Sequence, residues 1–284
     1  MKIKKSTIVI LLILTGIIGM SILAPWIAPY DPNAIDMTNI LAKPGKGHWL
    51  GTDNLGRDVL SRVIYGGRQS IILAVAATFG SLLLGMTVGL ISGYFGGVVD
   101  SFFTIISNIF QGLPGTTLMI AISGLMGGGI KSLLFSLVLT SWAGFSRLAR
   151  GETMSVCAES FIEGERATGS GNFRIIIRNV IPNIMGNLIV VFTTRIGRAI
   201  LSVASLSFLG LGLQPPQPDW GIMISDARTL FRSAPLLLIA PGFCVIALSL
   251  CINLLGDAIR DFVDVHSETG GDFQWESRIL ILSI

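Results

Sequence analysis

Long apolar blocks alternate with short polar segments along the whole chain. Several blocks hold about 20 apolar residues, the length that a helix needs to cross the ~30 Å hydrocarbon layer of a bilayer. Within lipid, a helix satisfies its backbone polar groups internally. The pattern therefore predicts an all-α membrane protein with about six transmembrane helices, expected near residues 7–28, 71–94, 101–125, 130–148, 184–212 and 236–258.

Residues 1–28 are expected to form the N-terminal transmembrane helix. The basic start (Lys2, Lys4, Lys5) and the apolar run after it are also typical of a cleaved signal peptide. Trp26 near the end of the run and the further spans that follow favour a retained helix. The lysines then place the N-terminus in the cytoplasm, and six alternations place the C-terminus there too. Lys and Arg are only slightly more frequent in the segments assigned to the cytoplasm, so this test of orientation is weak.

Residues 29–70 are polar and rich in turn-forming residues, and we expect an extracytoplasmic loop. The second half of this loop is amphipathic at helical spacing, so we expect it to lie along the outer membrane surface. Residues 71–264 are expected to form a five-helix core that contains a cytoplasmic loop at 149–183. The tail at 265–284 is polar with a short apolar end, and it suggests no function.

Composition supports a lipid environment. Hydrophobic residues make up 51% of the chain and charged residues only 13%, whereas soluble domains carry about 25% charged residues. So few charges cannot cover a water-facing surface. The net charge of +3 gives no basis for nucleic-acid binding.

The sequence lacks the motifs for metal binding, ATP binding and catalysis. The two histidines are far apart and the three cysteines have no metal-ligand spacing, so we expect free thiols and no metal site. The chain has no G-x-x-x-x-G-K-[ST] loop and is not expected to bind ATP itself. It also has no catalytic set such as H-E-x-x-H, which argues against an intramembrane enzyme, and no catalytic residue or cofactor is expected.

A polar, arginine-rich segment at 161–183 interrupts the apolar pattern. Glu163 is followed six positions later by Gly169, and Pro182 comes thirteen positions after that. This frame resembles the "EAA" coupling loop of binding-protein-dependent ABC importer permeases, with Glu-Ala-Ala, three residues, Gly, nine residues, Ile, one residue and Leu-Pro. Three positions depart from the family's pattern, namely Gly164 and Glu165 in place of the two alanines and Asn179 in place of Ile.

The resemblance implies two short cytoplasmic helices that dock in a groove of an ATPase subunit. Gly169 would form the turn between them, and Pro182 would restart the chain into the next span. The residues carried over as the ATPase-coupling loop are Phe161, Glu163, Gly164, Glu165, Arg166, Ala167, Gly169 and Pro182.

Three further blocks, at 47–70, 207–228 and 254–264, resemble the C-type permease of the dipeptide/oligopeptide/nickel importer family. The resemblance implies the type I ABC importer permease fold in a bacterial cell (inner) membrane. It also implies a homologous B-type permease chain, an extracytoplasmic substrate-binding protein, and two ABC ATPase subunits that hold ATP and Mg. Membrane lipid surrounds such a subunit, and no nucleic acid is involved.

The prediction of the cargo rests on fewer residues than the prediction of the family. Peptide-type members of the family commonly carry a Glu shortly before the SFLGLG block, where this chain has Val203. That apolar residue and the WGIMISDAR run favour a metal chelate (metallophore) or nickel complex as the cargo. The alternative is a dipeptide or oligopeptide.

Arg195 and Arg198 lie within an expected span and, three positions apart, share one helix face. Charged side chains in a membrane usually face a protein interior or a water-filled path. We therefore expect them to line the translocation pathway and to attract an anionic cargo. The alternative is that the span begins later and both side chains reach the cytoplasmic interface or pair with an acid of the partner chain.

Charged and aromatic residues of the expected outer loops are candidates for an outer gate or for contact with the binding protein. The alternatives are solvated side chains, local salt bridges that hold the amphipathic segment, and an interfacial anchor in the case of Trp220. His48, next to Trp49, is expected to be structural rather than a metal ligand. The candidates are Asp53, Arg57, Asp58, Trp220, Asp226 and Arg228.

Overall fold

Helices are the regular elements of the described chain, and no strand occurs within it. This computed structural model describes the backbone of residues 5–281 and the side chains of residues 7–261. The elements are α1 (Lys5–Ile22), α2 (Ala24–Ile27), α3 (Val59–Phe95), α4 (Gly97–Gly112), α5 (Gly115–Leu125), α6 (Ile130–Cys157), α7 (Ser160–Ala167), α8 (Asn172–Ile175), a π-helical turn (Ile176–Val180), α9 (Ile181–Phe208), α10 (Trp220–Ala227), a 3₁₀ turn (Arg228–Leu230) and α11 (Leu236–Ile281).

The described helices confirm the expected all-α membrane fold. Four of them are long and apolar enough to cross a membrane, at Val59–Phe95, Ile130–Cys157, Asn172–Phe208 and Leu236–Asp261. The helices α4 and α5 meet at 91° and amount to a fifth crossing if the pair is one span, while α1 contributes a shorter apolar helix. The expected number of about six spans is reached only when the bent pair and α1 are both counted.

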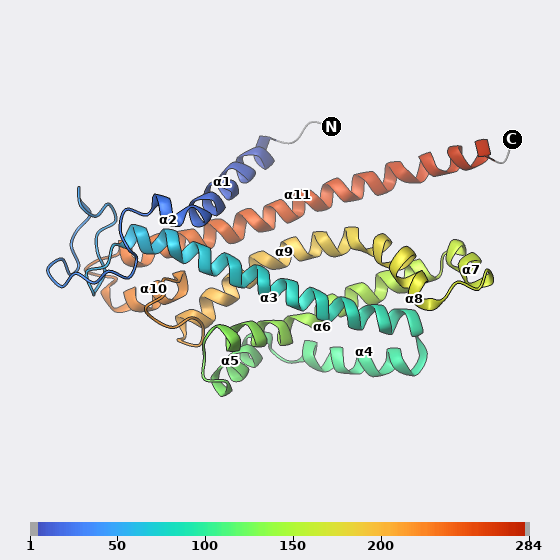
Figure 1. The fold of residues 1–284 in the computed structure, drawn as a ribbon, viewed down its shortest axis with the longest axis horizontal. Helices are drawn as coiled ribbons and strands as arrows, with labels where there is room; N and C mark the ends of the chain where they lie inside the picture. Colours follow the sequence, from blue (N-terminus) through green and yellow to red (C-terminus); the bar gives the residue numbers. More distant parts are fainter. Residues whose placement is uncertain (1–4, 282–284) are drawn as a thin grey trace.

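The long helices α3, α6, α9 and α11 run along the long axis of the molecule (Figure 1). The helices α7 and α8 lie at one end of this bundle, and α10 lies at the other end with the irregular chain that precedes α3 (Figure 1). The polar segment at 161–183 and the residues expected near an outer gate are therefore separated by the length of the spans.

One expected boundary is wrong because α3 begins at Val59 rather than near residue 71. The amphipathic segment is the first part of this helix and does not lie apart from it on the membrane surface. Its apolar face is buried in the core, where Val59 and Val63 pack in one cluster with Trp220 and Met223 of α10. The apolar face that was expected to contact the membrane surface therefore packs against other helices of the protein.

The expected helix at 101–125 is also divided. Leu113 between α4 and α5 is extended (ψ 141°), as expected for a residue before proline, and Pro114 is the N-cap of the next helix. The chain turns by 91° at this point. By contrast, α6 continues to Cys157, well beyond the expected end near residue 148.

Close packing of α3 against α6 depends on glycines spaced four residues apart on α3. A Cβ on Gly89 would lie 2.5 Å from the Ser146 carbonyl oxygen and 2.7 Å from the Ala149 Cβ. Gly85 and Gly93 approach the α6 backbone in the same way. Small residues at this spacing let two membrane helices approach closely and gain van der Waals contact, which contributes to their association in lipid.

Replacing Gly89 with valine should force α3 and α6 apart, because the new side chain would overlap α6 backbone atoms that cannot move aside locally. Overpacking of this kind costs about 1–3 kcal/mol or more. We expect a lower apparent melting temperature and a lower yield of the purified protein. Gly242→Ala in α11 is the control, because a Cβ there meets nothing within 4 Å; equal melting of both variants would contradict this packing.

Candidate functional site

The polar segment forms two short helices joined by a glycine turn. Gly169 follows α7 with a φ of +80°, a left-handed conformation that glycine adopts at no steric cost. The turn is held from within the segment, because the Ser170 hydroxyl donates to Glu165 Oε2 at 2.5 Å and the Thr168 hydroxyl donates to the Glu165 carbonyl at 2.9 Å. Glu163 is exposed on the first turn of α7. The segment is thus a defined structural unit at the end of the bundle.

Two isoleucines that sequence reasoning missed attach this unit to the bundle. Ile162 and Ile175 are fully buried, and they pack with Phe145 and Ala149 of α6 in a second core cluster. Their signal in the sequence is weak, because Ile175 stands in a run of three isoleucines whose periodicity does not reveal the buried member. Burial of both side chains from either side of the turn makes the unit part of the bundle.

Four further apolar side chains of the segment are exposed, whereas Val180 is fully buried in the same cluster. Phe161 is 41% exposed, Phe173 is 77% exposed and Ile177 is 48% exposed, and Ala167 is also exposed. These side chains are free to contact another protein. This surface is suited to receive a partner.

Tyr94 at the end of α3 connects the segment to a second helix of the bundle. Its hydroxyl donates to Asn172 Oδ1 at 3.0 Å, and the guanidinium carbon of Arg166 lies 5.5 Å from the centre of its ring. A cation in this position is attracted by the face of the ring. Both α7 and α8 therefore contact α3, so a displacement of the segment also acts on that helix.

Pro182 lies in the first turn of α9, and α8, the π-helical turn and α9 form one continuous helical path from Asn172 to Phe208. Proline lacks the N–H that an α-helix interior uses. The π-helical turn at Ile176–Val180 ends two residues before it, and the Ile181 N–H bonds to the Ile176 carbonyl five residues back. The irregular turn thus accommodates the proline, and the segment is joined rigidly to a long span.

Arg195 and Arg198 lie together on α9 and line one cavity of about 100 Å³ between α3, α6 and α9. Arg195 Nη1 donates to the Ser141 carbonyl at 3.2 Å, and its guanidinium carbon lies 4.4 Å from the centre of the Phe145 ring. Gly144 leaves room for this group, because a Cβ there would overlap the guanidinium. The expected shared face is therefore present, with walls from two helices that the sequence did not indicate.

The cavity is strongly cationic. Arg195 is half-buried, and its Nε atom is buried without a hydrogen-bond partner among the described residues. Arg198 is exposed, and the side chains that line the cavity include no carboxylate as far as the structure describes them. Two unneutralised guanidinium groups in a partly desolvated space favour an anion there.

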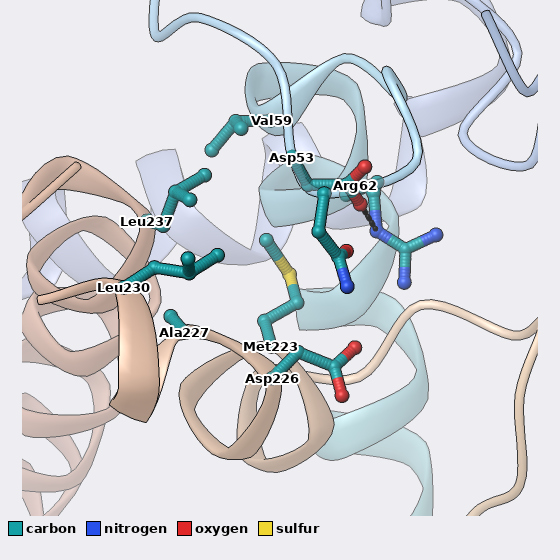
Figure 2. Close-up of a pocket in the computed structure, with 9 residues that line it drawn as sticks. Asp53, Val59, Arg62, Met223, Asp226, Ala227, Leu230 and Leu237 are labelled. Atoms are coloured by element: carbon teal, nitrogen blue, oxygen red, sulfur yellow. Dashed lines mark ion pairs between the residues drawn. The ribbon is translucent and has the colours of Figure 1, made fainter. Parts of the chain in front are cut away.

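At the other end, the outer cap consists of residues 29–58 and α10. Within it, Asp53 accepts from Arg57 Nε at 2.7 Å. Asp53 also pairs with Arg62 Nε at 3.5 Å (Figure 2). Arg62, which sequence reasoning missed, is 2% exposed and donates to the Pro32 carbonyl at 2.9 Å. Asp226 of α10 lies 3.9 Å from Arg57 Nη2; burial raises the pKa of the Asp226 carboxyl, and Arg57 opposes that change.

Asp58 is engaged at the start of α3. Its Oδ2 atom accepts from the Ser61 N–H at 2.8 Å, which is a helix N-cap, and its Oδ1 atom lies 2.9 Å from His48 Nδ1. The His48 ring packs on Tyr30 at a centroid distance of 4.7 Å. Asp58 is 3% exposed. Its carboxylate and His48 therefore hold the chain in place at the start of α3.

Trp220 is also buried, and its Nε1 donates to the Val63 carbonyl of α3 at 2.9 Å. The preceding Asp219 caps α10 and accepts from the Ser70 hydroxyl at 3.0 Å, while burial raises the pKa of its carboxyl. These contacts join α10 to α3.

Of the six outer candidates, Arg228 and Asp226 are the exposed ones. Arg228 lies at the start of the 3₁₀ turn, apart from the cluster of Asp53, Arg57 and Arg62.

Comparison with known families is consistent with this arrangement. The family model described as "Binding-protein-dependent transport system inner membrane component" matches residues 85–265. A second model, "N-terminal TM domain of oligopeptide transport permease C", matches residues 2–44. Together they span the polar segment at 161–183 (the coupling segment), both arginines of the cavity on α9 (the arginine cavity) and α10.

Characterised relatives match over most of their length. The dipeptide transport system permease protein DppC of Alkalihalophilus pseudofirmus is 38% identical over 264 residues, which cover 93% of this chain and 87% of the relative. The glutathione transport system permease protein GsiD of Pectobacterium atrosepticum is 36% identical over 249 residues, covering 87% and 83%. Their names refer to peptides, not to nickel or metallophores.

Solved structures support the fold alone. A subunit of the MetNI methionine ABC transporter in an inward-facing conformation aligns with a TM-score of 0.56 at 18% identity, covering 71% of this chain and 96% of that chain. An amino acid ABC transporter with histidines aligns with a TM-score of 0.53 at 14% identity, covering 74% and 94%. These neighbours have the type I permease fold that the sequence resemblance implied. The chain therefore belongs to the family of binding-protein-dependent ABC importer permeases and is a C-type permease, a transport subunit and not an enzyme.

Proposed function

We propose that this permease forms half of the translocation pathway for short peptides that carry a free carboxylate. The arginine cavity is the observation that carries the proposal. It offers two guanidinium groups with no carboxylate among its described lining residues, and a peptide's terminal carboxylate is the anion that would complete it. The relatives named for dipeptide and glutathione transport support the same class of cargo.

The metal-chelate expectation rested on Val203 and on the WGIMISDAR run, and Val203 carries less weight in the folded chain. Val203 is fully buried in the main core cluster and does not line the arginine cavity. An apolar residue at this position is explained by packing, whatever the cargo. A bare divalent cation is also unsuited to a cavity that holds two positive charges and no negative one.

The coupling segment is proposed to receive the ATPase through its exposed apolar side chains. Asn172 and Arg195 belong to one continuous helix and are separated by roughly 35 Å at 1.5 Å per residue. A push on the segment would therefore reach the cavity along a rigid element, and Tyr94 would carry it to α3 as well. Closing and opening of the two ATPase subunits then turns the pathway outward and inward.

We propose the other subunits of the complex from the same family relationship. A homologous B-type permease would supply the other half of the pathway, two ABC ATPases would bind ATP and Mg, and an extracytoplasmic binding protein would deliver the cargo to the outer cap. We place the N- and C-termini in the cytoplasm of a bacterial cell (inner) membrane, which puts the coupling segment on the side where ATP is available.

Uptake by the full importer complex in proteoliposomes tests the cargo. We expect ATP-dependent uptake of a labelled dipeptide, and none of Ni²⁺ or chelated Ni²⁺. Arg198→Gln should lower dipeptide uptake about tenfold or more, since a hydrogen bond to a charged group is worth about 1.5–3 kcal/mol. Uptake of the corresponding dipeptide amide, which lacks the carboxylate, should be insensitive to this change.

Arg232→Gln is the matched control, because Arg232 is also exposed but lies before α11 and away from the cavity. Uptake of nickel or its chelates in place of peptides would overturn the proposed cargo. An equal loss for the dipeptide and its amide in Arg198→Gln would overturn the role of the arginine cavity while leaving the cargo class intact.

A further inference from the structure

A second cavity adjoins the arginine cavity on the same helix. This apolar chamber, of about 190 Å³, lies between α5 and α9. Its walls include Met119 and Ile120 of α5 and Leu201 and Leu206 of α9. The 91° break before α5 separates this short helix from α4, so that α5 packs on its own against its neighbours. Nothing in the established role of the subunit assigns this space a function.

Ser202 lines both cavities. It follows Arg198 by four residues, so it lies one helical turn, about 5.4 Å, further along the same face of α9. No other described residue engages its hydroxyl, which can therefore accept a hydrogen bond from a peptide N–H. The two cavities thus form one track along α9 that changes from cationic to apolar.

We propose that the chamber receives the side chain of the C-terminal residue of the transported peptide, and that it favours large apolar side chains. This inference rests on the proposed function. With the terminal carboxylate at Arg198, the side chain on the adjacent Cα need reach only about one helical turn to enter the chamber. Apolar walls on two helices favour a leucine- or phenylalanine-like group over a methyl group or a charge.

Ser205→Leu tests the chamber by filling it. Ser205 is exposed on α9 and lines the chamber, and its hydroxyl donates only to the Leu201 carbonyl one turn back, at 2.7 Å. The substitution therefore leaves the core unchanged. The matched control is Ser101→Leu on α4, another exposed helical serine whose hydroxyl donates one turn back, to the Gly97 carbonyl at 3.1 Å.

The assay is uptake of three labelled dipeptides, Ala-Phe, Phe-Ala and Ala-Ala, by the full importer complex, each corrected for its affinity for the binding protein. In Ser205→Leu we expect Ala-Phe uptake to fall roughly tenfold or more, the discrimination that an apolar pocket achieves. Ala-Ala and Phe-Ala should keep at least half of their uptake, which also shows that the variant folds and assembles. Ser101→Leu should transport all three normally.

The outcomes separate this inference from the proposed function. If the wild-type complex transports the dipeptides but Ser205→Leu leaves Ala-Phe unchanged, or lowers all three equally, the chamber assignment is overturned and the peptide cargo stands. Equal losses for Ala-Phe and Phe-Ala would also overturn the assignment to the C-terminal residue. A wild-type complex that transports none of them overturns the proposed function and this inference together.

Discussion

Gly169→Val should abolish coupled uptake while the complex still assembles and hydrolyses ATP. Gly169 has a φ of +80°, and a β-branched residue in this conformation costs of order 1–3 kcal/mol. Since α7 has only eight residues, such a cost is enough to change how it meets α8. We expect at least a tenfold loss of uptake, with binding of cargo to the extracytoplasmic protein unchanged, measured by uptake and ATP hydrolysis on one preparation.

Two further variants make this test specific. Gly164→Ala is the control, because a Cβ there meets nothing within 4 Å and the family's pattern has alanine at this position; uptake should be normal. Glu163→Arg reverses an exposed charge without strain and should also uncouple hydrolysis from uptake. Normal coupled uptake in both Gly169→Val and Glu163→Arg would remove the coupling segment from the mechanism.

Asp53→Ala should destabilise the outer cap strongly. The Asp53 carboxylate accepts from the backbone N–H groups of Leu55 and Arg57, and it neutralises two guanidinium groups that are 5% and 2% exposed, those of Arg57 and Arg62. Removing one partner of a buried ionic group costs about 3–5 kcal/mol. For a chain of this size that corresponds to a loss of at least about 6 °C in the apparent Tm of the purified complex.

Asp31→Ala is the control, since Asp31 is exposed and its carboxylate accepts only the local Asn33 N–H, at 2.8 Å; its Tm should change little. The pair also addresses the alternative that Asp53 is an outer contact for the binding protein. An unchanged Tm together with weaker docking of that protein would show a contact role and contradict the structural one.

Short motifs with fixed spacing are recognisable in the amino-acid sequence alone. The frame of Glu163, Gly169 and Pro182 indicates the correct family, because a glycine turn and a proline at set positions depend on local backbone geometry. Arg195 and Arg198 are predicted to share a face, since their spacing alone decides this in a helix. The substrate interpretation is weaker because it uses Val203, whose surroundings no local rule reveals.

The partners of these residues are visible only in the fold. Arg62 is separated from Pro32 by 30 positions in sequence, and Trp220 is separated from Val63 by 157. Ile162 and Ile175 are recognisable as anchors only because both pack against α6. Such contacts join segments that have no common pattern in the sequence.

The sequence by itself determined the membrane class, the approximate position of most spans and the family. Hydropathy suffices for this because crossing a bilayer requires long apolar helices whatever surrounds them. Only the tertiary structure decided which face of each helix is buried, where α3 begins and which residues line the two cavities. The physical reason is that lipid-facing and core-facing positions are both apolar in a membrane, so hydropathy cannot distinguish them, and close packing of small residues such as Gly85 and Gly89 makes the choice.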